Sequence, residues 1–211
     1  MKIIRPVQKV VDAFSALPGI GPKTAARLAF YLLHVPQERL EKFATSLARL
    51  KPDTHECEIC MNVGEEDICP ICADPSRDKS TICVVESVLD LLAFEKAESY
   101  KGVYQILGGV INPMANIGPD ELFIPNLLKR LQESQVREVI LATNVSMEGE
   151  ATALYIDAKI KKLQENEKIS QDIKVSRIGR GLPTGSEVEF ADGMTLMRAL
   201  ESRVRFNQDG N

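Results

Sequence analysis

Residues 81–98, TICVVESVLDLLAFEKAE, decide the fold class of this chain. The short β-branched run that ends at Glu86 predicts a buried strand, in which Cys83 would be a small buried side chain. Apolar residues then recur at helical spacing and predict a helix. The alternation continues, with strands expected at 102–107, 138–143 and 173–178 and helices at 119–134 and 148–165. We therefore expect an α/β domain with a mostly parallel sheet over residues 79–176.

The segments on either side of this domain have a different character. Residues 1–53 contain three stretches with helical periodicity, 7–17, 23–35 and 37–50, and a Pro-Gly-Ile-Gly-Pro turn separates the first two. Residues 177–211 begin with a glycine-rich stretch and end in a predicted helix. We expect the first segment to be a helix-hairpin-helix domain and the last to be a short C-terminal segment.

Residues 54–78 lose the helical period and hold two cysteine pairs, Cys57-x-x-Cys60 and Cys69-x-x-Cys72. Each pair places two thiolates on one side of a tight turn, and two facing turns supply the tetrahedral sulfur ligands that zinc prefers. Four protein ligands leave no position for water, so we expect one structural zinc ion. An iron–sulfur cluster also accepts four thiolates and stays an alternative.

The turn between the first two predicted helices has features that suit a phosphate. Gly19 and Gly21 permit close approach of the backbone, and the N–H groups that begin the next helix would face outward. Lys23 and Arg27 lie four residues apart, so both can face the same ligand. Residues 1–53 carry nine Lys/Arg and four Asp/Glu, a net charge of +5, whereas the rest of the chain has a net charge of −9. This pattern predicts sequence-independent DNA binding, with a hairpin used only for packing or oligomerisation as the alternative.

Acidic residues follow two of the predicted strands. Glu86 ends one strand, and Glu148 and Glu150 follow another. Parallel sheets place their chemistry at the carboxyl ends of the strands, and carboxylates grouped there could bind Mg²⁺ for phosphoryl transfer. These residues are therefore a candidate magnesium site.

Residues 82–90, ICVVESVLD, and 141–155, LATNVSMEGEATALY, resemble the two halves of the Toprim domain of topoisomerases and primases. In catalytic members the second strand ends in Asp-x-Asp, but here these positions are Asn144 and Ser146. An amide and a hydroxyl replace two carboxylates poorly around Mg²⁺. We expect a Toprim fold without nuclease or topoisomerase activity, and the alternative is a Mg²⁺-dependent Toprim enzyme.

The order of these parts resembles the RecR family of bacterial recombination mediators over essentially the full length. The stretches that carry the resemblance are LPGIGPKTAARLAFYLL, the cysteine pairs, ICVVES and ILATNVSMEGEATALYI. The resemblance implies a non-enzymatic role in recombinational DNA repair, acting with RecF and RecO to help load RecA on gapped DNA. It also implies a ring-shaped homotetramer, built through one surface of the N-terminal helices and another of the C-terminal oligomerisation segment at 177–211. The edge with Glu86, Asn144, Glu148 and Glu150 would then be a partner surface, for RecO. The chain departs from the family pattern at residues 112–116, Asn-Pro-Met-Ala-Asn, where an acid and a glycine are lost.

Several function classes are not expected. No apolar run approaches the roughly 18 residues of a membrane helix, and the first residues lack the pattern of a signal peptide, so we expect a cytoplasmic protein. The glycine-rich stretch at 179–193 lacks the Gly-Lys-Ser/Thr of a P-loop, so we expect no direct ATP hydrolysis.

Overall fold

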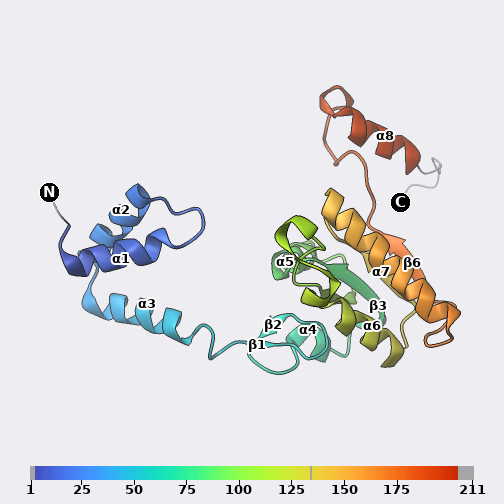
Figure 1. The fold of residues 1–211 in the computed structure, drawn as a ribbon, viewed down its shortest axis with the longest axis horizontal. Helices are drawn as coiled ribbons and strands as arrows, with labels where there is room; N and C mark the ends of the chain where they lie inside the picture. The colour runs from blue at the N-terminus through green and yellow to red at the C-terminus, as the bar shows by residue number, and fades with distance from the viewer. Residues whose placement is uncertain (1–2, 134, 204–211) are drawn as a thin grey trace. The chain divides into compact units, whose positions relative to one another are not determined.

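The computed structural model describes residues 3–133 and 135–203 (Figure 1). The chain forms two compact units, Met1–His55 and Glu56–Asn211. The first is helical, and the second combines the four-cysteine segment, a parallel sheet with helices, and the C-terminal segment. The predicted fold class is confirmed.

The first unit holds three helices, α1 (Arg5–Ser15), α2 (Pro22–Leu32) and α3 (Gln37–Arg49). Helices α1 and α2 form a hairpin, in which Val7 and Val11 of α1 pack against Ala25 and Ala29 of α2. The two alanines are small, so the helix backbones approach closely and a short turn can join them. This packing fixes which face of α2 is turned outward.

The second unit begins with a small four-cysteine module and continues into the sheet domain. Its α-helices and β-strands, the first of which lies across the boundary between the units, are β1 (His55–Glu56), β2 (Val63–Gly64), α4 (Pro70–Ala73), β3 (Asp78–Val85), α5 (Val88–Lys96), β4 (Gly102–Ile106), α6 (Ile124–Glu133), β5 (Glu138–Leu141), α7 (Met147–Glu165), β6 (Lys174–Arg177) and α8 (Gly193–Glu201). The strand order in the large sheet is β4-β3-β5-β6, and each neighbouring pair is parallel. Strand β3 is central, with Val84 opposite Gln105 on one side and Leu141 on the other.

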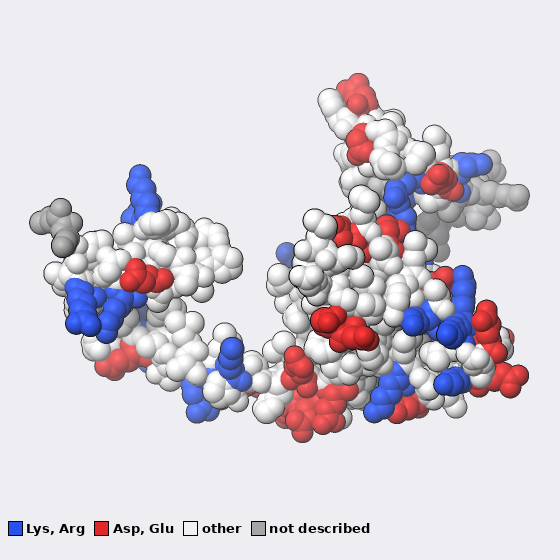
Figure 2. All heavy atoms as spheres, viewed as in Figure 1, with Lys and Arg blue, Asp and Glu red and all other residues white. Residues whose placement is uncertain are grey.

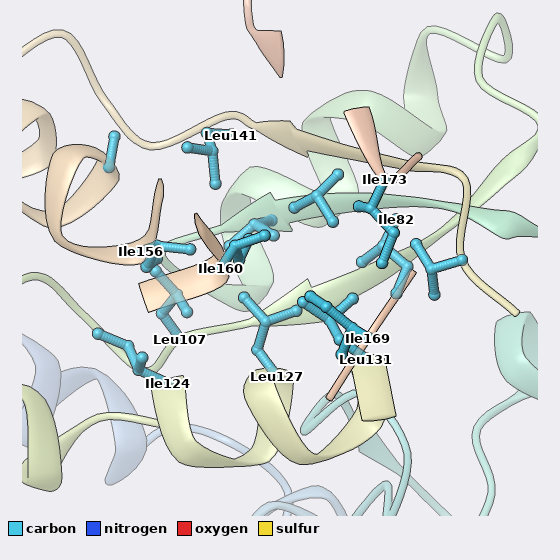
Figure 3. Close-up of a cluster of buried hydrophobic side chains, with 14 of the residues drawn as sticks. Ile82, Leu107, Ile124, Leu127, Leu131, Leu141, Ile156, Ile160, Ile169 and Ile173 are labelled. Carbon is cyan, nitrogen blue, oxygen red and sulfur yellow. The ribbon is translucent and has the colours of Figure 1, made fainter. Parts of the chain in front are cut away.

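Both faces of the sheet are buried, as in other parallel sheets. On one face, Ile82 and Val84 join the main core with Leu127 of α6 and Ile156 of α7 (Figure 3). On the other face, Cys83 and Val85 pack with Leu91 of α5. Cys83 is the buried side chain expected from the sequence, and burial raises the pKa of its thiol to about 12. It is therefore an unreactive core residue.

The helix expected over residues 119–134 differs from the structure. A 3₁₀ turn spans Pro119–Glu121, and α6 begins only at Ile124. Between them the backbone N–H of Phe123 donates to the carbonyl of Leu107 at 2.8 Å. That bond joins the segment to the end of β4 and interrupts the helix. Residue 134 lies outside the described residues.

Candidate metal centre and nucleic-acid interface

The four cysteines meet as predicted. Cys57 and Cys60 come from the turn that follows β1, and Cys69 and Cys72 from the start of α4. Their sulfur atoms all lie within 4.8 Å of one another, and each residue is buried. Within residues 3–133 and 135–203, these cysteines are the only group of three or more His, Cys, Asp or Glu side chains placed to share a metal ion.

The geometry of this cluster fits one zinc ion. The Sγ atoms of Cys60 and Cys69 are 3.5 Å apart, close to the spacing of about 3.8 Å that bonds of about 2.3 Å give around tetrahedral zinc. The backbone N–H of Cys69 donates to Cys57 Sγ at 3.3 Å, which favours a thiolate. Four buried thiolates this close would repel one another, so a cation is needed to hold all four in that form. Sulfurs this close leave no room for a cluster of several irons.

The cysteine module is joined directly to the sheet. Strand β4 is an edge strand, and the backbone N–H of Ile106 donates to the carbonyl of Cys60 at 2.9 Å. Met61 and Ile71 of the module pack against the second core cluster of the sheet. A metal ligand thus takes part in the hydrogen bonding of an otherwise open sheet edge.

The turn between α1 and α2 is built as predicted, but its two glycines differ. Gly19 has a φ of 78°, a backbone conformation that is strained for any residue with a side chain. Gly21 precedes α2 with an ordinary φ of −78°, and a Cβ there would meet nothing within 4 Å. Folding of this unit therefore does not require glycine at position 21. No side chain caps α2, so the N–H groups of its first turn are open to an anion.

Lys23 and Arg27 lie exposed on the outer face of α2. Neither forms an ion pair with any residue that the structure describes. Figure 2 shows Lys and Arg side chains projecting from the hairpin unit. Aromatic side chains, which sequence reasoning missed, share a shallow groove of about 610 Å³ with these two cations.

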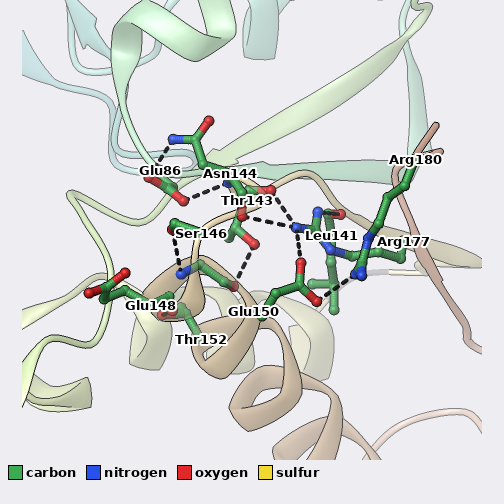
Figure 4. Close-up of polar contacts among 11 residues, drawn as sticks. Glu86, Leu141, Thr143, Asn144, Ser146, Glu148, Glu150, Thr152, Arg177 and Arg180 are labelled. Carbon is green, nitrogen blue, oxygen red and sulfur yellow. Dashed lines mark hydrogen bonds and ion pairs between the residues drawn. The ribbon is translucent and has the colours of Figure 1, made fainter. Parts of the chain in front are cut away.

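The acidic edge of the sheet is largely engaged within the molecule (Figure 4). Glu86 Oε1 accepts from the backbone N–H of Asn144 at 2.6 Å, and Oε2 accepts from Asn144 Nδ2 at 2.7 Å. Ser146 Oγ accepts from the backbone N–H of Gly149 at 3.0 Å and so caps α7. The residues that stand where catalytic Toprim domains carry acids thus hold the local structure together.

Two arginines that sequence reasoning missed engage Glu150 (Figure 4). Arg177 at the end of β6 donates to Glu150 Oε1 at 2.8 Å, and Arg180 donates to Oε2 at 2.5 Å. Burial alone would raise the pKa of Glu150, but the two guanidinium groups hold it below its ordinary value. The basic stretch 177–180, RIGR, which begins at the last residue of β6, was the available signal. Glu148, in contrast, is exposed, and its carboxylate has no partner in the part of the chain described.

Comparison with known proteins decides the family. Four family models match in series: the RecR helix-hairpin-helix at residues 7–51, the RecR zinc finger domain with four cysteines at 54–74, the Toprim domain at 80–179 and the RecR C-terminal model at 181–204. Recombination protein RecR of Bifidobacterium longum subsp. infantis is 47% identical over 197 residues, covering 93% of this chain and 94% of the relative. The same protein of Bifidobacterium animalis subsp. lactis gives the same values. The chain belongs to the RecR family.

In this chain, Gly149 explains why the Toprim edge is so compact. A Cβ at this position would lie 2.2 Å from the carbonyl oxygen of Asn144 and 3.0 Å from Glu86 Oε1. The first turn of α7 therefore packs directly on the pair formed by Glu86 and Asn144. The match to the four-cysteine model of the family agrees with the sulfur geometry, and the centre is a zinc site.

The C-terminal segment of this RecR chain starts at the arginine pair. Arg180 connects to the last helix, since its carbonyl accepts from Ser202 Oγ at 2.7 Å. Helix α8 leaves Met194, Met197 and Leu200 largely exposed. None of the helices in the described residues is both long and apolar enough to cross a bilayer.

Proposed function

We propose that this RecR-family chain is a non-enzymatic, DNA-binding mediator of recombinational repair in the cytoplasm. In this role it acts with RecF and RecO to promote RecA loading on gapped DNA. The observation that carries the proposal is the chemistry of the N-terminal end of α2. Lys23 and Arg27, which form no ion pair within the described residues, stand beside uncapped N–H groups and a glycine that the fold itself does not need. These are contacts to phosphates, which position a protein on DNA without reading its sequence.

The state of the Toprim edge supports a role without catalysis. Both oxygens of Glu86 accept hydrogen bonds from Asn144, and Ser146 caps α7. The candidate Mg²⁺ ligands there are the Glu86 carboxylate, which is already hydrogen-bonded, and the neutral side chains of Asn144 and Ser146. The rival proposal, a Mg²⁺-dependent nuclease or topoisomerase-like enzyme, predicts nicking of plasmid DNA that Glu86→Gln abolishes. We expect no Mg²⁺-dependent nicking by the purified protein.

Assembly would compensate for the acidic body of the protein. The chain has a net charge of −4, and its basic hairpin is small. A homotetramer ring would bring several hairpins to one DNA molecule and raise affinity through effective concentration. We propose the edge with Glu86, Asn144, Glu148 and Glu150 as the surface for RecO. The exposed carboxylate of Glu148, which has no partner among the described residues, is its most available group.

The test of DNA binding replaces Lys23 and Arg27 by alanine together. We expect a clear loss of affinity and a shallower dependence of log Kd on log salt, by about 0.7–0.9 per phosphate contact removed. The matched control is Lys42→Ala with Arg49→Ala, which removes the same charge from α3, where both residues are already ion-paired. Equal effects of the two double variants would overturn the assignment of DNA binding to the hairpin.

A further inference from the structure

The outer face of α2 carries aromatic side chains as well as cations. A shallow groove on this face is lined by Lys23, Ala26, Arg27, Phe30, Tyr31 and His34. The opposite face of the helix is the one that packs on α1, through Ala25 and Ala29. The rings are therefore not needed for the core of the hairpin.

The rings are unusually open to solvent. Phe30 is 47% exposed and Tyr31 is 65% exposed. His34 Nδ1 donates to the carbonyl of Phe30 at 3.0 Å, which fixes the imidazole at the end of the helix. Exposed aromatic side chains beside free cations are the combination that binds single-stranded nucleic acid, because bases stack on the rings while phosphates contact the charges.

We propose that this face binds single-stranded DNA, with Tyr31 as the stacking platform for a base and with Phe30 beside it. The proposal rests on the proposed DNA-binding function and specifies its substrate. Lys23 and Tyr31 are eight residues apart, about 12 Å along the helix. One strand can therefore place phosphates on Lys23 and Arg27 and then a base on the ring.

The face favours a single strand over a duplex and over a second copy of the chain. In a duplex the faces of the bases are stacked on each other, so the phosphates could reach Lys23 and Arg27 but no base could reach Tyr31. The residues that line the groove include two cations and no carboxylate. A symmetric contact between two copies through this groove would bring like charges together.

The chain contains no tryptophan, which allows a direct test. In the zinc-loaded protein, Tyr31→Trp introduces a single tryptophan on the proposed platform, and it can be excited at wavelengths at which the remaining tyrosines do not absorb. We expect oligo(dT) to change its emission over the same concentrations at which anisotropy of labelled oligo(dT) reports binding. A hairpin-closed duplex of equal length should leave the emission nearly unchanged when it is bound. An unchanged emission on bound oligo(dT) would overturn the stacking proposal and leave the proposed function standing.

Affinity measurements on Tyr31→Ala complete the test. We expect the affinity for oligo(dT) to fall about 5- to 150-fold, with the salt dependence unchanged, and Tyr31→Phe to restore it because the ring is kept. Equal losses of affinity for oligo(dT) and for the closed duplex would overturn the proposal. A lower mass of the DNA-free variant would also overturn it and would assign the face to contact between copies. If the wild-type protein binds neither DNA, the proposed function falls as well.

Discussion

Asn144 and Ser146 occupy the positions at which metal-binding Toprim domains carry acids. In this chain both have structural roles, since Asn144 donates twice to Glu86 and Ser146 caps α7. Gly149 lets the first turn of α7 approach this pair. The edge is thus held together by hydrogen bonds in which Asn144 donates and the Ser146 hydroxyl accepts.

The tightness of this edge can be tested with Gly149→Ala. The added methyl group would lie 2.2 Å from the carbonyl oxygen of Asn144, so backbone must shift. We expect the free energy of unfolding in urea to fall by about 1–3 kcal/mol, as for other overpacked sites. Gly179→Ala is the control, because a Cβ there meets nothing within 4 Å. Equal stability of the two variants would show that the edge is not tightly packed around Gly149.

A pH dependence follows from the depressed pKa of Glu150. Its charged form is favoured in the folded protein by Arg177 and Arg180, so it adds stability above the ordinary glutamate pKa of about 4.3. That contribution is lost as the pH falls below this value and through the folded pKa. We expect the melting temperature of the wild type to exceed that of Glu150→Gln at pH 6, and the difference to shrink as the pH falls below about 4.3. A difference that stays constant with pH would contradict this role.

Several of these residues could be predicted from the sequence, and others could not. The four cysteines, the hairpin with Lys23 and Arg27, and the buried Cys83 follow from local spacing and periodicity. The partners of Glu150 could not be predicted, because Arg177 lies 27 residues away and reaches it only through strand pairing. The break before α6 depends on a backbone hydrogen bond from Phe123 to Leu107, which no local sequence pattern predicts.

At the scale of elements, the zinc module is part of the sheet domain. Its place in the sequence predicts a brace at the join between the hairpin and the Toprim domain. What the structure shows is its attachment to the sheet, where Ile106 of the edge strand β4 bonds to the carbonyl of Cys60 and Met61 packs on the core. Zinc therefore organises a backbone segment that completes the edge of the sheet.

Removal of zinc, by chelation or by Cys57→Ser, should act first on this edge. We expect a lower melting temperature and faster amide exchange along β4, with Ile106 among the first amides to lose protection. Loss of DNA binding should follow only as folding or assembly fails. A zinc-free protein with the same melting temperature and the same oligomeric state would contradict this role.

At the scale of the whole molecule, we expect α3 to form part of the interface between copies of the proposed homotetramer. No residue of α3 is buried, and apolar side chains on it and at its end, including Phe43, Leu47 and Leu50, are 43–61% exposed. We expect Phe43→Glu with Leu47→Glu to lower the mass in solution without unfolding the α1–α2 hairpin. Lys42→Glu is the control on the same helix. An unchanged mass for the double variant would show that α3 is not an interface between copies.

We propose that assembled hairpins hold DNA without cutting it. The most direct test of this proposal is the mass of the zinc-loaded protein in solution, measured with and without gapped DNA in the presence of Mg²⁺. We predict a dimer or tetramer that binds the DNA and leaves it intact. A strict monomer, or a DNA substrate cut in a Mg²⁺-dependent manner, would contradict the account.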